Sequence, residues 1–372
     1  MQVADLALQR SKYKHLSDDE WRWLLQQVEG RERTADKLPT FAAMPDWWYP
    51  VRLSCEQCSS ELTARYKASL TSQNSNFVDL TGGYGVDTYF LSEQFAHTDY
   101  VEQNAELCRI AAHNFAGKSI RIHNTSAEEF LVSAGSYDLI YLDPARRDSH
   151  GGKVFRLADC TPNVVELLPT LLAHGKRLLL KLSPMLDLTQ AIKELSQVSW
   201  DIHVVAVKNE VKEVLLLSGG TGQITAIDLA KKDQAFVFTR EEETNCEAIN
   251  VRGTVDGESV NYLYEPNAAI LKAGAYKLVA QRFGLRTLDV NTHLYVSDTF
   301  IPNFPGRVWI IKGEPQKTKG EKANVLCRNY PLTPEQLKQK LHLRDGGTDF
   351  IIGCRVAGKP TLFLAERVED VH

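Results

Sequence analysis

From residue 76 onward, short apolar segments alternate with amphipathic helical patterns, and this alternation constrains the fold more than any other feature of the chain. Such alternation is typical of βα units, in which each helix returns the chain to a parallel sheet. It predicts an α/β fold. The expected strands are Phe77–Leu80, Thr98–Val101, Ser119–His123, Tyr137–Leu142 and Arg177–Leu182, and the expected helices are Val86–Phe95, Ala105–Phe115 and Val164–Ala173.

Two more apolar strands are expected at Asp201–Val207 and Glu213–Leu217, with only a short polar segment between them. A connection this short requires antiparallel neighbours. Five parallel strands that close on an antiparallel hairpin make a Rossmann-like sheet of seven strands. The hairpin distinguishes this sheet from the one in nicotinamide-dependent dehydrogenases.

At 372 residues the chain is too long for one core, so several domains are expected. The segment from Ser17 to Glu20 predicts a capping box that opens a helix. After Gly222 the pattern is rich in strands, among them Ile224–Leu229, Ala235–Phe238 and Ile249–Gly253, with one continuous helix at Pro266–Phe283 and another at Thr333–Leu341. The expected domains are a helical region over 1–70, the Rossmann-like sheet over 71–220, and small α+β domains over 221–310 and 311–372.

The composition favours a globular protein, because 43% of the residues are hydrophobic and 24% are charged. The chain shows neither a signal-peptide pattern nor a run of about eighteen apolar residues, so we expect a cytoplasmic protein with no membrane contact. Seven cysteines do not suggest a disulfide framework. The close pair Cys55 and Cys58 lacks the second pair of a zinc ribbon, so we expect it to be structural and expect no bound metal.

Charge is distributed unevenly along the chain. The net charge is −4, yet residues 270–372 hold 16 Lys and Arg against 10 Asp and Glu, which makes that segment +6 and the remainder −10. A polyanion such as RNA should therefore meet the C-terminal part first. Aromatic residues of the N-terminal region, Trp47 and Trp48 among them, are expected to pack in the core rather than to stack on bases.

A glycine-rich turn follows the first strand of the sheet, in the segment from Asp79 to Asp87 (DLTGGYGVD). Glycine is needed where the backbone turns sharply and approaches a ligand closely. A dehydrogenase fingerprint would require a third glycine where Thr88 stands, so dinucleotide binding is disfavoured. The expected cofactor-binding residues of this loop are Asp79, Thr81, Gly82, Gly83 and Gly85.

Two further strand ends complete the expected cofactor site. The second strand ends at Glu102, where a carboxylate can accept both hydroxyl groups of a ribose. The third leads into the segment 124–129, where the backbone near Ala127 could meet the edge of an adenine. The alternative is structural: Asp79 as a strand-end cap, Glu102 as a surface carboxylate and Ser126 as a helix cap.

The fourth strand ends in Asp143, Pro144, Ala145 and Arg146, at the sheet edge where open α/β proteins bind ligands. Transfer of a small group to an amine needs the nitrogen lone pair aimed at that group rather than a strong base. Asp143 could orient the amine by accepting its hydrogens, while Pro144 would stiffen the loop. Arg146 and Arg147 could bind a phosphate, or they could form ion pairs with Asp148 or Asp159.

The segments DLTGGYG (79–85), Glu102 and DPAR (143–146) resemble motifs I, II and IV of class I methyltransferases, whose sheet has the topology expected here. More narrowly, EQCSSELTARYK (56–67), DPAR and YEPNAA (264–269) resemble a bacterial family of methyltransferases with a THUMP-like C-terminal domain, over nearly the whole chain. The Rossmann-like part is also similar to RNA cap guanine-N2 methyltransferases. The resemblance implies S-adenosylmethionine as cofactor, a ferredoxin-like domain before the THUMP-like one, and RNA as substrate.

Two departures from related enzymes narrow the chemistry. Amino methyltransferases usually carry Pro and an aromatic residue where this chain has Ala145 and Arg146, so the motif offers no ring to stack on a flipped base. Uracil-C5 enzymes need a downstream nucleophilic cysteine, and the segment from Lys181 to Pro184 (KLSP) has none.

The sequence therefore predicts an S-adenosylmethionine-dependent methyltransferase acting on a base nitrogen of RNA, held by the basic C-terminal part. Asp143, Pro144 and Arg146 are its expected catalytic loop. Two alternatives stay open: a non-catalytic protein that binds the cofactor and RNA, and a methyltransferase acting on a small molecule or a protein. A nicotinamide oxidoreductase is disfavoured, and the sequence leaves the oligomeric state open.

Overall fold

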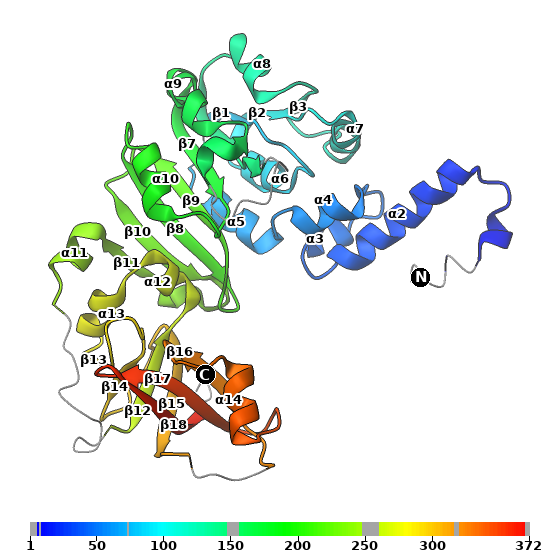
Figure 1. Cartoon of the computed structure of the whole chain (residues 1–372). Helices are drawn as coiled ribbons and strands as arrows, with labels where there is room; N and C mark the ends of the chain where they lie inside the picture. Colours follow the sequence, from blue (N-terminus) through cyan, green and yellow to red (C-terminus); the bar gives the residue numbers. More distant parts are fainter. Residues whose placement is uncertain are drawn as a thin grey trace. The chain divides into compact units, whose positions relative to one another are not determined.

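The computed structural model describes residue 6 and residues 9–72, 74–146, 156–247, 260–315 and 320–368 (Figure 1). The chain forms two compact units, one comprising residues 1–200 and 215–221 and the other residues 201–214 and 222–372. The expected strand at Ile249–Gly253 and the side chains of Arg146 and Arg147 lie outside what the structure describes.

A nine-stranded sheet has the order β11-β10-β8-β9-β7-β4-β1-β2-β3. Neighbouring strands from β3 to β7 run parallel, as the βα pattern predicts. Counted from the β3 edge, the seven strands β3-β2-β1-β4-β7-β9-β8 have the order of the class I methyltransferase sheet. The strands are β1 (Asn74–Asp79), β2 (Phe95–Val101), β3 (Ile120–His123), β4 (Tyr137–Leu142), β7 (Gly175–Leu182), β8 (Trp200–Val207), β9 (Glu210–Ser218), β10 (Gln223–Asp228) and β11 (Phe236–Thr239).

The expected count of seven strands is too low. β10 pairs in parallel with β8, and β11 pairs antiparallel with β10. The residues Ile224 and Ala226 of β10 are buried, so its alternating pattern belongs to a strand with one covered face. Without β10, the backbone groups along the edge of β8 would have no sheet partner, and pairing satisfies them.

The expected hairpin is formed by β8 and β9, which are neighbours in the sheet. Lys208 and Asn209 connect them with φ of 52° and 63°, the positive values that a two-residue turn of type I′ requires at both positions. Both backbone amides donate to the carboxylate of Asp228, at 3.0 and 2.6 Å. The turn is therefore held by the strand that follows it.

Helices separate the parallel strands, and three of the five lie where the amphipathic patterns predict them, at residues 86–92, 105–114 and 164–174. The five helices are α6 (Val86–Ser92), α7 (Ala105–Asn114), α8 (Ala127–Val132), α9 (Val164–His174) and α10 (Leu188–Glu194). Asn104, Ser126 and Asn163 cap α7, α8 and α9 by accepting backbone hydrogen bonds. Completely buried strand residues such as Phe77 and Ile140 form the core, which fixes the strand ends where the site lies.

The N-terminal region is helical, with η1 (Arg10–Tyr13), α2 (Asp18–Thr34), α3 (Pro39–Ala42), α4 (Arg52–Gln57) and α5 (Glu61–Ser69). The predicted capping box is present, with Ser17 and Glu20 bonded reciprocally at the start of α2. Phe41 stacks on Trp47 at 4.0 Å between ring centroids, and Trp47 donates to the Tyr84 hydroxyl at 2.9 Å. Trp47 therefore packs in the core, as its spacing predicts.

The C-terminal part contains a seven-stranded sheet in the order β13-β14-β12-β15-β18-β17-β16. One helix was expected over Pro266–Phe283, but Gly274 at φ +79° ends α12 in a left-handed cap, so two helices form. The elements are η3 (Leu229–Gln234), α11 (Arg240–Asn245), β12 (Tyr262–Pro266), α12 (Ala268–Ala273), α13 (Tyr276–Arg282), β13 (Arg286–Thr287), β14 (Tyr295–Ser297), β15 (Gly306–Gly313), β16 (Asn324–Arg328), α14 (Pro334–Leu341), β17 (Asp349–Val356) and β18 (Lys359–Arg367).

Within the described ranges, no helix has both the length and the apolar character needed to span a membrane.

Candidate cofactor and active site

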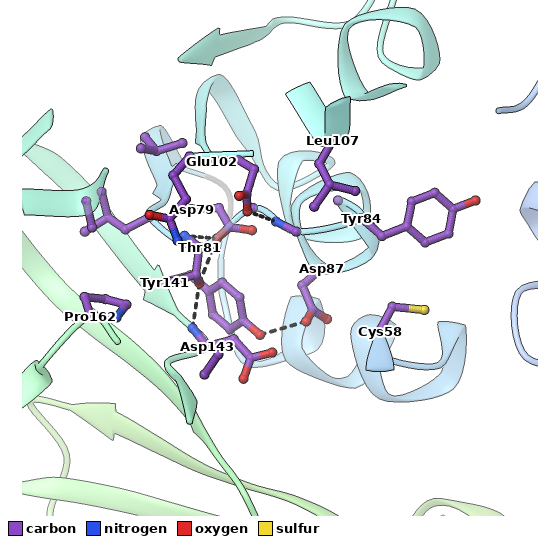
Figure 2. A pocket seen from close by; sticks show the side chains of 18 of the residues that line it. Cys58, Asp79, Thr81, Tyr84, Asp87, Glu102, Leu107, Tyr141, Asp143 and Pro162 are labelled. Carbon is purple, nitrogen blue, oxygen red and sulfur yellow. Dashed lines mark hydrogen bonds between the residues drawn. The ribbon is translucent and has the colours of Figure 1, made fainter. Parts of the chain in front are cut away.

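A pocket of about 330 Å³ lies at the carboxyl ends of β1, β2 and β4 (Figure 2). The glycine loop and three strand ends, far apart in sequence, meet around it. Its lining includes the expected residues Asp79, Thr81, Gly82, Gly83, Gly85, Glu102, Ala127 and Asp143. Of the expected catalytic loop, Asp143 lines the pocket and so does its neighbour Ala145, whereas Pro144 is not among the described lining residues.

Asp79 ends β1 and is buried beneath the glycine loop. One of its carboxylate oxygens accepts from the Thr81 amide at 2.9 Å, and the other accepts from the Thr88 hydroxyl at 2.6 Å. Burial raises the pKa of Asp79 to about 7, although these two hydrogen bonds favour the ionised form. The Asp79 carboxyl group thus holds the loop through two hydrogen bonds, and burial makes its ionisation harder than that of an exposed carboxyl group.

The glycine loop is shaped by close backbone packing at two positions. A Cβ on Gly82 would lie 2.2 Å from the buried Tyr100 ring, which leaves no room for a side chain. Gly85 has a φ of +83°, and a Cβ there would lie 2.5 Å from the Phe115 ring. At these two positions the loop therefore presents backbone rather than a side chain to the pocket.

Glu102 follows β2 and accepts the Gly83 amide at 2.9 Å and the Asn104 amide at 2.7 Å. These bonds fix the carboxylate at the pocket wall between the glycine loop and α7. Thr125, Ser126, Ala127 and Glu128 line the same pocket from the start of α8. The second and third strand ends thus share one cavity.

Asp143 is bound from two sides. Its backbone amide donates to the Thr81 hydroxyl at 2.7 Å, and its carboxylate accepts from the Lys181 ammonium group. Lys181 lies on β7, the neighbour of β4 in the sheet. The sequence analysis gave Lys181 no role, and only its position near the end of the adjacent strand could have indicated one.

The loop after Asp143 continues as the short strand β5 (Ala145–Arg146), which pairs with β6 (Cys160–Thr161). Thr161 and Pro162 line the pocket together with Ala145. The returning segment therefore lies beside the reaction loop, a contact between residues too distant in sequence to be read from the motif.

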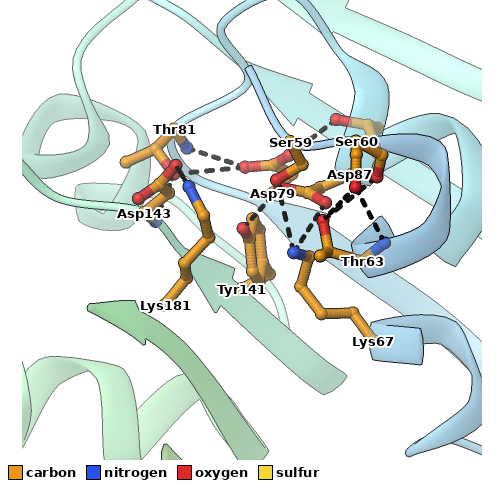
Figure 3. Close-up of polar contacts among 11 residues, drawn as sticks. Ser59, Ser60, Thr63, Lys67, Asp79, Thr81, Asp87, Tyr141, Asp143 and Lys181 are labelled. Carbon is orange, nitrogen blue, oxygen red and sulfur yellow. Dashed lines mark hydrogen bonds and ion pairs between the residues drawn. The ribbon is translucent and has the colours of Figure 1, made fainter. Parts of the chain in front are cut away.

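A buried polar network adjoins the pocket around Asp87, in the first turn of α6 (Figure 3). One carboxylate oxygen accepts from the Ser59 and Tyr141 hydroxyls, each at 2.7 Å, and the other lies 3.2 Å from the Lys67 ammonium. Burial acts to raise the pKa of Asp87. The opposite charges of Lys67 and Lys181, together with the two hydroxyl groups, nevertheless hold that pKa below its ordinary value.

The N-terminal helical region also contributes to the pocket. Ser54, Gln57, Cys58 and Ser59 line it together with the strand ends. Cys58 is labelled beside Asp87 in Figure 2, and burial raises the pKa of its thiol. Sequence reasoning treated Cys58 as a structural cysteine and did not place this segment at the site.

Comparisons with known proteins bear on this geometry. Residues 262–305 match the model of a ferredoxin-like domain, and residues 310–367 match that of a THUMP-like domain. No curated protein matches the chain.

Among solved structures, the chain is similar to a protein from Porphyromonas gingivalis W83 that is assigned as a methyltransferase. The two are 33% identical over 95% of this chain and 92% of that one, with a TM-score of 0.84. Matches at lower TM-scores include a protein from Streptococcus mutans, also assigned as a methyltransferase and solved with S-adenosylhomocysteine (12% identity, 42% of this chain and 95% of that one, TM-score 0.32). Another is an rRNA methylase from Streptococcus thermophilus, which is 13% identical over 42% of this chain and 93% of that one, with a TM-score of 0.31.

Sequence identity of 33% over nearly the full length of both chains establishes that this protein and the Porphyromonas gingivalis protein are related. The chain belongs to the methyltransferase family of the Porphyromonas gingivalis protein, in which a class I methyltransferase sheet is followed by ferredoxin-like and THUMP-like domains.

Proposed function

We propose that this protein transfers a methyl group from S-adenosylmethionine to a base nitrogen of RNA. The observation that carries the proposal is the convergence of Asp79, Glu102 and Asp143, from three strand ends, on one pocket with the glycine loop. The cavity of about 330 Å³ falls within the usual size of small-molecule sites.

The donor set fits this cofactor. Glu102 is held at the wall by two backbone amides and retains lone pairs that can accept both ribose hydroxyls. The backbone near Ala127 is the expected contact for the adenine edge, and Asp79, Thr81, Gly82, Gly83 and Gly85 enclose the methionine part. When bound, S-adenosylmethionine supplies an activated methyl group.

The acceptor nitrogen would be oriented by Asp143, with Pro144 and Arg146 in the same loop. The Asp143 amide is fixed by Thr81, so the loop is tied to the glycine turn and its carboxylate has a defined position. Accepting the amino hydrogens aims the nitrogen lone pair at the methyl group, which is the main requirement of the reaction. The Lys181 ammonium forms an ion pair with the Asp143 carboxylate and so helps to hold it in place.

RNA as the substrate class is supported by the THUMP-like domain and by the +6 charge of residues 270–372. Phosphate contacts from Lys and Arg in this part would supply affinity without sequence preference. Selection of the base would then fall to the pocket around Asp143, Ala145 and Pro162.

The test is transfer of a labelled methyl group to total RNA from cells that lack the protein, followed by digestion to nucleosides. We expect label in an N-methylated nucleoside with the wild type and at least a hundredfold less with Asp143→Asn, because removing one transition-state contact commonly costs about that much. Label in protein or in small molecules only would contradict RNA as the substrate.

A second candidate function is non-catalytic binding of the cofactor and RNA. Two observations favour it: the carboxylate of Asp143 is engaged by Lys181, and the sequence has Arg146 where related amino methyltransferases have an aromatic residue that would stack on a base. Binding of both ligands without transfer to any substrate pool would support this candidate.

A further inference from the structure

The segment from Ser54 to Ser59 is a structural element of the pocket that no cofactor motif includes. It comprises the end of α4 and the turn before α5, and four of its residues line the cavity. The Lys37 ammonium holds the end of α4 by donating to the carbonyl groups of Cys55 and Glu56 at 3.1 and 2.8 Å. The segment is therefore fixed in place by contacts outside the pocket.

A buried ion pair fixes the same segment from the other side. Ser59 donates to Asp87 at 2.7 Å and lies 3.3 Å from the Lys67 ammonium, and Lys67 is completely buried. Separating α5 from α6 would remove Lys67 from Asp87 and leave charges without their partners, which is strongly unfavourable in a protein interior. The segment is thus a permanent wall of the pocket rather than a detachable cover.

The position of this wall indicates which part of a ligand it meets. Ser59 bonds to Asp87, and Asp87 bonds to Tyr141, two residues before Asp143 on the way to the reaction loop. Glu102, the expected ribose partner, is instead held by the backbone amides of Gly83 and Asn104. The wall therefore belongs to the reacting end of the pocket rather than to the nucleoside end.

We propose that residues 54–59 bind the amino-acid end of the cofactor. The inference rests on the proposed function and adds a contact region supplied by the N-terminal helices. Ser54 and Gln57 carry a hydroxyl and an amide that can donate to the ligand carboxylate and accept from its ammonium group. Ser59 and Lys67 act indirectly, as positioning residues that hold this wall against Asp87.

The experiment is calorimetric titration of the full chain with two ligands that differ only at that end. S-adenosylhomocysteine carries the amino-acid portion, and 5′-methylthioadenosine lacks it. In Gln57→Trp, an exposed pocket-lining residue gains a large ring, and the matched control Leu53→Trp changes an exposed residue one turn earlier on α4 that does not line the pocket.

We expect Gln57→Trp to weaken S-adenosylhomocysteine at least about tenfold while changing 5′-methylthioadenosine less than about threefold. Gln57→Ala should weaken S-adenosylhomocysteine by a smaller factor, and Leu53→Trp should match the wild type. Unfolding temperatures of the variants identify any that fail to fold, and Gln57→Ala then serves as the test.

Unchanged affinity for both ligands in Gln57→Trp and Gln57→Ala would overturn the inference while leaving the proposed function intact. Equal weakening of both ligands would also overturn it, since the wall would then meet the nucleoside. If the wild type binds neither ligand, the proposed function itself fails and the inference fails with it.

Discussion

The ammonium group of Lys67 lies 3.2 Å from a carboxylate oxygen of Asp87, and the Lys67 side chain has no exposed surface. This pair connects α5 of the N-terminal region to α6, the helix that follows the first strand of the Rossmann-like sheet. Ser59 and Tyr141 share the other oxygen of the same carboxylate, so α5, α6, β4 and the turn before α5 meet at one buried charge. The pair therefore helps to hold in place the segments that line the neighbouring pocket.

Removing one partner of this pair should destabilise the protein strongly. Lys67→Met leaves Asp87 buried without its cation and should lower the free energy of unfolding by about 3–5 kcal/mol. Lys67→Met combined with Asp87→Asn should cost less than the sum of the two single changes, because no unpaired charge remains. Urea denaturation of the four proteins measures the coupling.

The matched control is Lys176→Met, because Lys176 pairs with Asp138 while 75% of its side chain is exposed. An exposed pair contributes about 1 kcal/mol or less, so this variant should resemble the wild type. Additive effects of the Lys67 and Asp87 changes would show that the buried pair is not coupled, contrary to the structure.

The raised pKa of Asp79 predicts that the stability of the protein decreases as the pH rises. Its pKa rises on folding from an ordinary value of 3.8 to about 7, so the folded protein holds this proton more tightly than the unfolded chain does. Stability from this group is therefore lost as the pH rises from about 4 to about 7, by up to about 4 kcal/mol.

Asp79→Asn removes the titration. Relative to the wild type, this variant should gain stability as the pH rises from about 4 to about 7, as followed by denaturant unfolding at each pH. A difference between the two proteins that stays constant with pH would show that Asp79 does not retain its proton on burial.

Gly82 tests the steric argument for the glycine loop. Gly82→Ala places a Cβ 2.2 Å from the Tyr100 ring and should lower stability by about 1–3 kcal/mol while displacing the loop and weakening cofactor binding. Gly135→Ala is the control, since a Cβ there meets nothing within 4 Å, and it should change stability by about 0.5 kcal/mol or less. Equal behaviour of the two variants in unfolding and in titration would refute the close packing of the loop.

The basic C-terminal part predicts a salt-dependent affinity for RNA. The logarithm of the affinity should fall linearly with the logarithm of the salt concentration, measured by fluorescence anisotropy with a labelled RNA oligonucleotide. Lys340→Glu and Lys359→Glu, both at exposed positions of the THUMP-like domain, should weaken binding and reduce the slope. Lys193→Glu on α10 should not, and an equal loss in this variant would argue against a C-terminal RNA surface.

The sequence predicts the positions of Asp79, Glu102 and Asp143 well, because parallel strands of one sheet end at a common edge and each residue follows an apolar strand. The class I order of strands follows from the same pattern with the hairpin. The sequence also predicts β10 and β11 as strands but assigns them to the following domain, because the glycine-rich segment before β10 reads as a boundary, while pairing with β8 depends on a distant edge.

The contacts that shape the pocket could not be predicted in the same way. Lys181 meets Asp143 only because β7 lies beside β4, and Lys67 meets Asp87 only because α5 packs on α6. Neither pair has a characteristic spacing, since tertiary packing alone brings the partners together. Gly274 is a different case, because a glycine within a helical pattern is also a known signal for a helix end.

The most direct test of the central claim is calorimetric titration of S-adenosylmethionine into the wild type, Glu102→Ala and Glu106→Ala. The account predicts binding on the order of micromolar to the wild type, at least about tenfold weaker binding to Glu102→Ala, and no change in Glu106→Ala, whose exposed side chain pairs with Arg109 away from the pocket lining. Absence of binding to the wild type, or equal affinity in all three proteins, would contradict the assignment of this pocket to the cofactor.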